Sequence, residues 1–294
     1  MAAVQTQGSS WSRPRQNPLH IYGGQACNSL MADSLSDRTP LHEAAYLGRL
    51  LHLRSLVAQG FHVDPLTMDG VSPLHEACLA GRYACAKFLL DNGANATAVT
   101  ADGATPLFNS CRSGSAACVR LLLQHGAPIH ASHQQASPLH EAAAKDHREC
   151  VELLLSRGAA IDLELPELGT PLYCACRAAA ARCVEVLLRS GADVCAGRGQ
   201  DRPLHAAVRW GGVKVVELLL DFGADGSRRN SEGRTPLDLS TPNSAVRFAL
   251  QKRGPCSLSQ LCRFCIRRSL GPSRFHRASS LFLPLRIKDF LLYQ

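Results

Sequence analysis

Residues 72–103 read SPLHEACLAGRYACAKFLLDNGANATAVTADG, and this stretch contains every part of a unit that the chain repeats. The proline of its Ser-Pro-Leu-His opening recurs at positions 40, 73, 106, 138, 171, 203 and 236, at intervals of 33, 33, 32, 33, 32 and 33 residues. A stack of equal units explains such a constant interval, because each unit buries its apolar face against its neighbours. The chain is therefore predicted to be a solenoid, and the functional question becomes what this stack binds.

The opening tetrapeptide of each unit predicts the start of a helix. A serine or threonine oxygen caps a free backbone N–H, and proline at the first helical position leaves no N–H unsatisfied. A leucine-rich run such as residues 88–90 follows about ten residues after the small residues of the first helix and predicts a buried second helix. Glycines that tolerate a left-handed C′ conformation follow the second helices, at Gly60, Gly93, Gly126, Gly158, Gly191 and Gly223.

Two departures from the repeat are predicted to lie outside its regular helices. The two 32-residue intervals place one-residue deletions in the loops, here called fingers, that lead into units four and six. The seventh unit meets Thr241-Pro242 soon after its first helix begins, so Ser244–Leu250 is predicted to form a short closing helix. Irregular terminal units are expected of capping repeats.

Helix, turn, helix and finger at a period near 33, with a Thr-Pro-Leu-His signature, resembles the ankyrin repeat. The resemblance covers about residues 37–253 and implies an all-α ankyrin-repeat solenoid of six to seven repeats. The units are predicted at about 37–69, 70–102, 103–134, 135–167, 168–199 and 200–232, with a degenerate cap at 233–253. Residues 1–36 mix Gln, Ser, Pro and Arg and are expected to be disordered.

The cysteines and the apolar content indicate an intracellular helical stack. Four of the thirteen cysteines, Cys85, Cys118, Cys150 and Cys183, recur at intervals of 33, 32 and 33 residues, so we expect a ladder of small buried side chains. Free thiols in a cytoplasmic or nuclear protein explain this pattern better than disulfides do. The sequence contains no apolar run of signal-peptide or membrane length, so no membrane partner is predicted.

The formal net charge of +8 belongs to the C-terminal tail. Residues 251–294 contain nine basic side chains and one acidic side chain, and nine minus one is eight, so residues 1–250 are formally neutral. A basic tail often binds nucleic acid. Here the bases are spaced through an amphipathic pattern instead of forming a run, which favours a solvated or acid-facing docking surface. We therefore predict no nucleic-acid partner.

The tail begins with GPCSLSQLCRFCIRR at residues 254–268 and predicts a short docking helix. Ser257 is a candidate N-cap. Apolar side chains fall on one helical stripe, at Leu258, Leu261, Cys262, Cys265 and Ile266. A helix of this length is unstable in isolation, so it must dock either on the last repeat or on another protein.

Ser-Leu, three residues, Cys, three residues and an aliphatic resembles the elongin-binding box of the SOCS box. Ser257, Leu258, Cys262 and Ile266 carry this resemblance, and Leu261 lies on the same stripe. Leu283-Pro284, about 20 residues later, resembles the start of the cullin box, which would also use Ile287. The cullin box commonly has a second proline two residues after the first, whereas this chain has Arg286.

The whole chain is thus similar to the ankyrin repeat and SOCS box family, with a three-helix SOCS box at about 254–294. This resemblance implies a ubiquitin-ligase adaptor without chemistry of its own. Its SOCS box would bind elongin B and elongin C and recruit a cullin, usually cullin 5, with a RING-box protein. Its ankyrin stack would hold the substrate protein. The alternative is a plain ankyrin scaffold or inhibitor whose tail packs on the last repeat or clamps an acidic partner.

No pattern in the sequence predicts catalysis, a metal site or a cofactor. His42, His75, His140 and His205 share one repeat position, so they form a row instead of converging, and we expect them to bond the turns of the repeats. Cys174 and Cys176 are two residues apart in one helix, and Cys262 and Cys265 lack a matching downstream pair, so we expect these cysteines to pack and not to bind zinc.

In the ankyrin fold the first helices and finger tips line a concave surface, which is the expected substrate site. Exposed first-helix positions are predicted at Glu43, Tyr46, Glu76, Asn109, Arg112, Lys145, Arg177, Arg209 and Trp210. The substrate-binding residues that we predict are Tyr46, Arg112, Lys145, Arg177, Arg209 and Trp210. Trp210 precedes Gly211, the expected end of its helix, and can either anchor a partner or cover the neighbouring repeat. Further candidates in the fingers are His130, His133, Gln134, Gln135, Glu164, Glu167, Arg198 and Asp201.

Overall fold

The computed structural model describes residues 37–130 and 137–252 and six separate positions of the tail: Cys265, Ile266, Ser269, Pro284, Arg286 and Asp289. Several predictions therefore lie outside the described residues. These are the disorder of residues 1–36, the shortened finger that contains His133, Gln134 and Gln135, and most of the tail residues named above.

The described chain folds as helix pairs, as the proline interval predicts. The first helices are α2 (Pro40–Leu47), α4 (Pro73–Leu79), α6 (Pro106–Ser113), α8 (Pro138–Ala144), α10 (Pro171–Arg177), α12 (Pro203–Ala206) and α14 (Pro236–Leu239). The second helices are α3 (Leu50–Ala58), α5 (Tyr83–Asp91), α7 (Ala116–Gln124), α9 (Arg148–Ser156), α11 (Ala181–Arg189), α13 (Gly212–Asp221) and α15 (Ala245–Lys252). Every first helix begins at the repeated proline, and α15 is the predicted closing helix.

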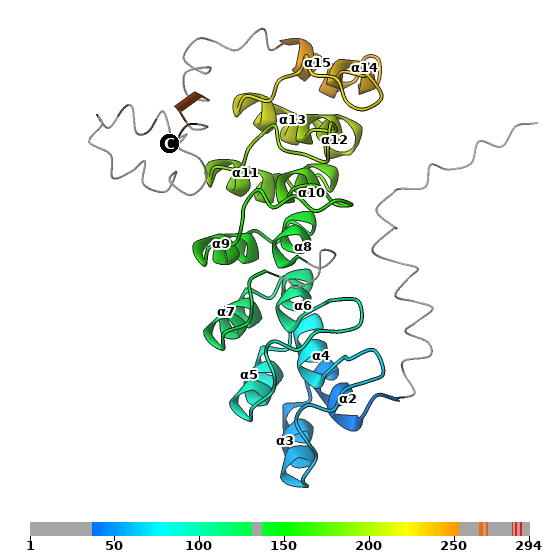
Figure 1. Cartoon of the computed structure of the whole chain (residues 1–294), viewed down its shortest axis with the longest axis vertical. Helices are drawn as coiled ribbons and strands as arrows, with labels where there is room; N and C mark the ends of the chain where they lie inside the picture. The colour runs from blue at the N-terminus through cyan, green and yellow to red at the C-terminus, as the bar shows by residue number, and fades with distance from the viewer. Residues whose placement is uncertain are drawn as a thin grey trace, which may run out of the picture. The chain divides into compact units, whose positions relative to one another are not determined.

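The helix pairs stack in the order of the chain. Each first helix packs on the next first helix, and each second helix packs on the next second helix. Figure 1 shows the two sets as separate columns, with the fingers projecting on the side of the first helices. The leucine of the signature tetrapeptide is buried in the first six units, as Leu74, Leu107 and Leu172 illustrate, and burying each such side chain stabilises the fold by about 2 kcal/mol.

Side-chain caps begin several of the first helices. The hydroxyl of Ser72 accepts a hydrogen bond from the amide of His75, and the Thr105 and Thr170 hydroxyls accept equivalent bonds. Ser137 makes no such bond, so the predicted cap is absent at this unit. The glycines after the second helices have positive φ angles of 77–99°, which confirms the predicted left-handed turns.

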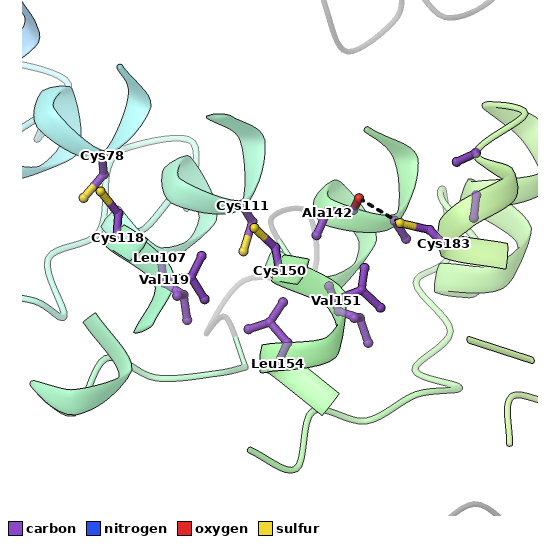
Figure 2. Close-up of a cluster of buried hydrophobic side chains, with 14 of the residues drawn as sticks. Cys78, Leu107, Cys111, Cys118, Val119, Ala142, Cys150, Val151, Leu154 and Cys183 are labelled. Atoms are coloured by element: carbon purple, nitrogen blue, oxygen red, sulfur yellow. Dashed lines mark hydrogen bonds between the residues drawn. The ribbon is translucent and has the colours of Figure 1, made fainter. Parts of the chain in front are cut away.

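The cysteine ladder is buried in the stack, as predicted. Cys85, Cys118, Cys150 and Cys183 are at most 1% exposed, and the cysteines of the described chain are free thiols. Figure 2 shows a second row that the repeat interval also contains: Cys78 points toward Cys118, and Cys111 points toward Cys150. Small side chains at both positions allow neighbouring units to approach closely.

The first helix of the sixth unit differs in form from those of the other units. It passes into a π-helical segment, Ala207–Gly211, and the positive φ of 72° falls on Gly212. This segment ends at Gly211, as predicted, but the positive φ lies one residue later than in the other units. Two adjacent glycines can each adopt the backbone conformation of the turn, so the extra residue is absorbed as a π-helical turn. Such segments are frequent at functional sites.

Candidate functional site

The four histidines of the signature are buried structural residues, as predicted. Their side chains are at most 2% exposed, and each Nε2 lies 3.0–3.3 Å from a backbone carbonyl of the finger leading into the next unit. In three units Nδ1 accepts a bond from the backbone amide that precedes the proline. Burial lowers the pKa of His75 and of His140 to about 4, so both rings are neutral at physiological pH.

The buried cysteines of the stack are poor nucleophiles and poor metal ligands in this environment. Burial raises the pKa of Cys150 and of Cys174 to about 11, so neither thiol ionises near neutral pH. The Cys174 thiol donates to the carbonyl of Leu168, and Cys176 is fully buried. In the described part of the chain, no group of three or more His, Cys, Asp or Glu side chains is arranged to hold a metal ion.

The predicted substrate-binding residues lie along the first helices and do not converge on one point. Here we call this set, Tyr46, Arg112, Lys145, Arg177, Arg209 and Trp210, the first-helix face. Tyr46, Lys145 and Arg209 are exposed, whereas Arg112, Arg177 and Trp210 are partly buried. They come from different units, α2, α6, the end of α8, α10 and the π-helical segment, so only a partner that spans several units could contact all of them.

The C-terminal end of the first-helix face is a small charged and aromatic cluster. The Arg209 guanidinium lies 5.1 Å from the Trp210 ring centroid, and one of its nitrogens lies 3.6 Å from a carboxylate oxygen of Glu232. Trp210 also packs against the apolar core. Both sequence interpretations of Trp210 therefore apply in part: the side chain covers the core and keeps some accessible surface.

The middle of the first-helix face carries cations with few partners. Arg112 lies 3.8 Å from Glu141 of the following unit, which is a weak ion pair. Among the residues that the structure describes, the side chains of Lys145 and Arg177 form no ion pair or hydrogen bond. Unpaired cations on one face of a stack favour an acidic partner surface.

Glu76 is wrongly predicted to be exposed. Its side chain is buried, and it forms an ion pair with Arg38, which precedes the first helix. The Arg38 guanidinium also lies 5.8 Å from the centroid of the Tyr46 ring. Glu43 occupies the same position in the first unit and is exposed, so the repeat position alone does not determine burial.

The finger candidates mostly bond one another. Arg198 pairs with Glu167 at 2.9 Å, and the Gly199 amide donates to Glu164 at 3.1 Å. The Tyr173 hydroxyl donates to Asp201 at 2.7 Å, and burial raises the pKa of this tyrosine. These contacts join two successive fingers, so Glu164, Glu167, Arg198 and Asp201 serve the shape of the stack. His130 is exposed.

Sequence reasoning missed the role of Tyr173, although a signal was present. Tyr173 stands where four other units have the signature histidine, and it takes over the link to the next finger through Asp201. Gly197 permits this finger to turn tightly, because a Cβ there would lie 2.2 Å from the carbonyl oxygen of Asp201. The replacement of the signature histidine by Tyr173 thus accompanies the shortening of the finger that contains Asp201.

Little of the predicted elongin and cullin surface is described. Ile266 is 42% exposed and in a helical conformation, and Pro284 and Arg286 are exposed. Ser257, Leu258, Leu261, Cys262, Leu283 and Ile287 lie outside the described residues. None of the described helices combines the length and apolarity that crossing a bilayer requires.

Comparison with known proteins covers both parts of the chain. Residues 17–100, 93–165 and 161–230 match the family "Ankyrin repeats (3 copies)", and residues 254–292 match the SOCS box. Ankyrin repeat and SOCS box protein 11 of Danio rerio is 55% identical over 293 residues, which cover 100% of each chain. The chain belongs to the ankyrin repeat and SOCS box family. Human ankyrin repeat and SOCS box protein 9 is 57% identical, over 90% of this chain and 91% of that protein.

Solved structures agree with the fold. The crystal structure of the human ASB11 ankyrin repeat domain matches with a TM-score of 0.72 and 53% identity, covering 75% of this chain and 100% of that one. The ankyrin repeat domain of Bcl-3, of the IκB family, matches with a TM-score of 0.58 and 30% identity, over 73% of this chain and 99% of that one. Membership in the ankyrin repeat and SOCS box family supports a general role as a substrate adaptor of a cullin-RING ubiquitin ligase, and at the level of the family a non-catalytic one.

Proposed function

We propose that this chain is the substrate-recognition adaptor of a ubiquitin ligase that contains elongin B, elongin C and cullin 5 with a RING-box protein. The observation that carries this proposal is the SOCS-box match at residues 254–292, directly after the ankyrin units. Within this match Ser257, Leu258, Cys262 and Ile266 stand at the spacing of an elongin-binding helix.

The proposal divides the chain at residue 253. Residues 37–253 hold the substrate, and residues 254–294 bind the ligase. Ser257, Leu258, Leu261, Cys262 and Ile266 contact the elongins, and Leu283, Pro284 and Ile287 contact the cullin. The exposure of Ile266 and Pro284 supports their availability to a partner. Arg286 stands where the cullin box commonly has a second proline, which bears on the choice of cullin.

The substrate is proposed to bind the first-helix face. Exposed or half-buried side chains of five units contribute to it, and Lys145 and Arg177 supply cations without described partners. The wide spacing of these residues along the stack suits a folded protein better than a short peptide. We propose that the adaptor functions in the cytoplasm and also in the nucleus.

Co-purification with the elongins tests the ligase assignment. The full chain should capture purified elongin B and elongin C at physiological salt, and the elongin-bound chain should then capture cullin 5 with its RING-box protein. The Leu258→Pro variant provides a matched control. If the intact chain captures no elongin, it is instead a plain ankyrin scaffold or inhibitor.

A further inference from the structure

The chain contains far more arginine than lysine. Its 32 basic residues include only five lysines, at positions 87, 145, 214, 252 and 288, and the remaining 27 are arginines. The same formal charge is therefore carried almost entirely by the side chain that has no primary amine. The preference for arginine matters in a protein that acts in a ubiquitin ligase, because ubiquitin is transferred to the primary amine of lysine.

The repeat shows that the fold accepts lysine at positions where other units have arginine. Lys87 lies 14 residues after its repeated proline, at the position that Arg54 and Arg120 occupy in other units. All three side chains are exposed on second helices, α5, α3 and α7 (Figure 1). Lys214 likewise stands at the position of Arg182, 11 residues after the proline. Backbone geometry therefore does not demand arginine at these positions.

Structural contacts account for some of the arginines and not for others. Arg82 donates to the carbonyl of Tyr46, and Arg182 donates to Asp146, so each guanidinium joins two neighbouring units. Arg120 and Arg157 are exposed, and in the described part of the chain their side chains form no hydrogen bond or ion pair. At these two positions a lysine would serve solubility and charge equally well.

We propose that arginine replaces lysine on this stack to protect the chain from ubiquitination by its own ligase. This inference rests on the proposed function. In the transfer step a neutral lysine amine attacks the thioester carbonyl at the ubiquitin C-terminus. An amide bond forms, the carbon–sulfur bond to the E2 cysteine breaks, the thiolate leaves and the amine loses a proton. A guanidinium stays protonated at all working pH values and cannot take part.

The few remaining lysines define where self-modification can occur. Lys87, Lys145, Lys214 and Lys252 are all exposed. Lys145 lies on the first-helix face, so a bound substrate would cover it. The substrate then presents most of the amines near the E2, while the adaptor that holds it presents few. The adaptor can thus survive several rounds of transfer.

A reconstituted ligase tests this inference. The full chain is assembled with elongin B, elongin C, cullin 5 and the RING-box protein, and is incubated with E1, E2, ubiquitin and ATP. Wild type is compared with the triple variant Arg54→Lys/Arg120→Lys/Arg157→Lys and with a matched triple Arg→Gln variant at the same positions. Discharge of ubiquitin from the E2 to free lysine reports ligase activity, and mass spectrometry locates ubiquitin on the chain.

The triple lysine variant should acquire ubiquitin severalfold faster than wild type, at the substituted positions, while the glutamine variant should match wild type. Thermal unfolding of the lysine variant should equal that of wild type, and the glutamine variant should lose only the contact of Arg54 with the Phe88 ring, whose centroid lies 5.6 Å from the guanidinium. If the assembly discharges ubiquitin to free lysine and the lysine variant is modified no faster than wild type, this inference is overturned and the proposed function stands. If no assembly forms or no ubiquitin is discharged, the proposed function fails, and the inference fails with it.

Discussion

The imidazole Nε2 of His140 donates a hydrogen bond to the backbone carbonyl of Gly169 at 3.0 Å, and so joins the start of one helix pair to the finger that leads into the next. The same contact links His42 to Val71, although the distances vary slightly from unit to unit. The rings of His42 and His75 also accept a backbone N–H through Nδ1, and a ring that donates through one nitrogen and accepts through the other is neutral. Burial lowers the pKa of His42, His75 and His140, so these three histidines couple the stability of the stack to pH.

The first prediction is a loss of stability in mild acid. The pKa values of His75 and His140 are about 4 in the folded chain, against 6.5 for a free side chain. The unfolded chain thus binds more protons between these values, and the free energy of unfolding decreases as pH falls from about 6.5 to about 4. The free energy of unfolding should decrease by about 3 kcal/mol for each of these two rings over this pH interval. Urea denaturation at several pH values measures the decrease.

A matched variant separates the histidines from the carboxylates. His75→Gln/His140→Gln keeps an amide donor at each position and removes the titration, so its stability should change much less between pH 6.5 and 4. Hydrogen bonds with Ser227 and Arg228 hold the pKa of Asp225 below its usual value, so this carboxylate loses its contribution only at lower pH. An unchanged pH dependence in the double variant would contradict the assignment to these rings.

The second prediction concerns Ala179, which adopts a left-handed conformation with φ 58°. Units one to three have glycine at this position. Because Ala179 is exposed and its Cβ is unfavourable in this region, Ala179→Gly should stabilise the stack by about 1 kcal/mol. The opposite change provides the control. A Cβ at Gly114 would lie 2.5 Å from the His147 ring, so Gly114→Ala should lower the unfolding temperature.

The third prediction concerns Asp146, the other residue that replaces glycine at this position, with φ 59°. Its carboxylate accepts from the Cys183 amide at 3.0 Å and from Arg182 at 2.8 Å. It therefore caps the first turn of α11 in the next unit, and Asp146→Ala should cost about 1–2 kcal/mol. Asp146→Asn keeps an acceptor oxygen and should cost less. Equal losses in the two variants would assign the effect to the charge and not to the cap.

These two residues show where sequence reasoning succeeds and where it stops. The interval of the prolines predicts the first residue of each first helix, because proline at the first helical position acts locally. The departures at Asp146 and Ala179 are visible in the sequence, but their meaning is not. At Asp146 the bonds to the next unit explain the departure, so it does not by itself mark a substrate site. The sequence of one unit does not predict these hydrogen bonds, because their partners, Arg182 and Cys183, lie in the next unit.

The sequence predicts less well which side chains become buried by contacts with a neighbouring unit. Glu43 and Glu76 occupy one repeat position, yet only Glu76 is buried, because Arg38 reaches it from the preceding unit. Gly211 and Gly212 are chemically identical candidates for the positive φ after the helix, and the local sequence does not distinguish them. The substrate-binding residues and the elongin-binding residues remain predictions.

The fourth prediction concerns the tail. Leu258→Pro should abolish elongin binding, because the substitution removes the apolar side chain by which the docking helix is proposed to contact elongin. The ankyrin stack should keep its unfolding temperature, since its stability is a sum of contacts between neighbouring units. Pull-down and thermal unfolding of the same preparation measure both. A stack that loses stability together with elongin binding would show that the division at residue 253 is wrong.

The last prediction concerns Arg209 and Trp210 at the end of the first-helix face. Removing a central aromatic anchor costs about 2 kcal/mol of binding free energy, so Arg209→Ala/Trp210→Ala should weaken substrate capture roughly thirtyfold. Elongin binding should not change. Because Trp210 also packs on the core, the unfolding temperature of the double variant must be measured with the affinity. Arg209→Ala alone removes only the stacking on Trp210 and the 3.6 Å pair with Glu232, so it separates binding from folding. Unaltered affinity in a folded double variant would move the substrate site toward the first units around Tyr46.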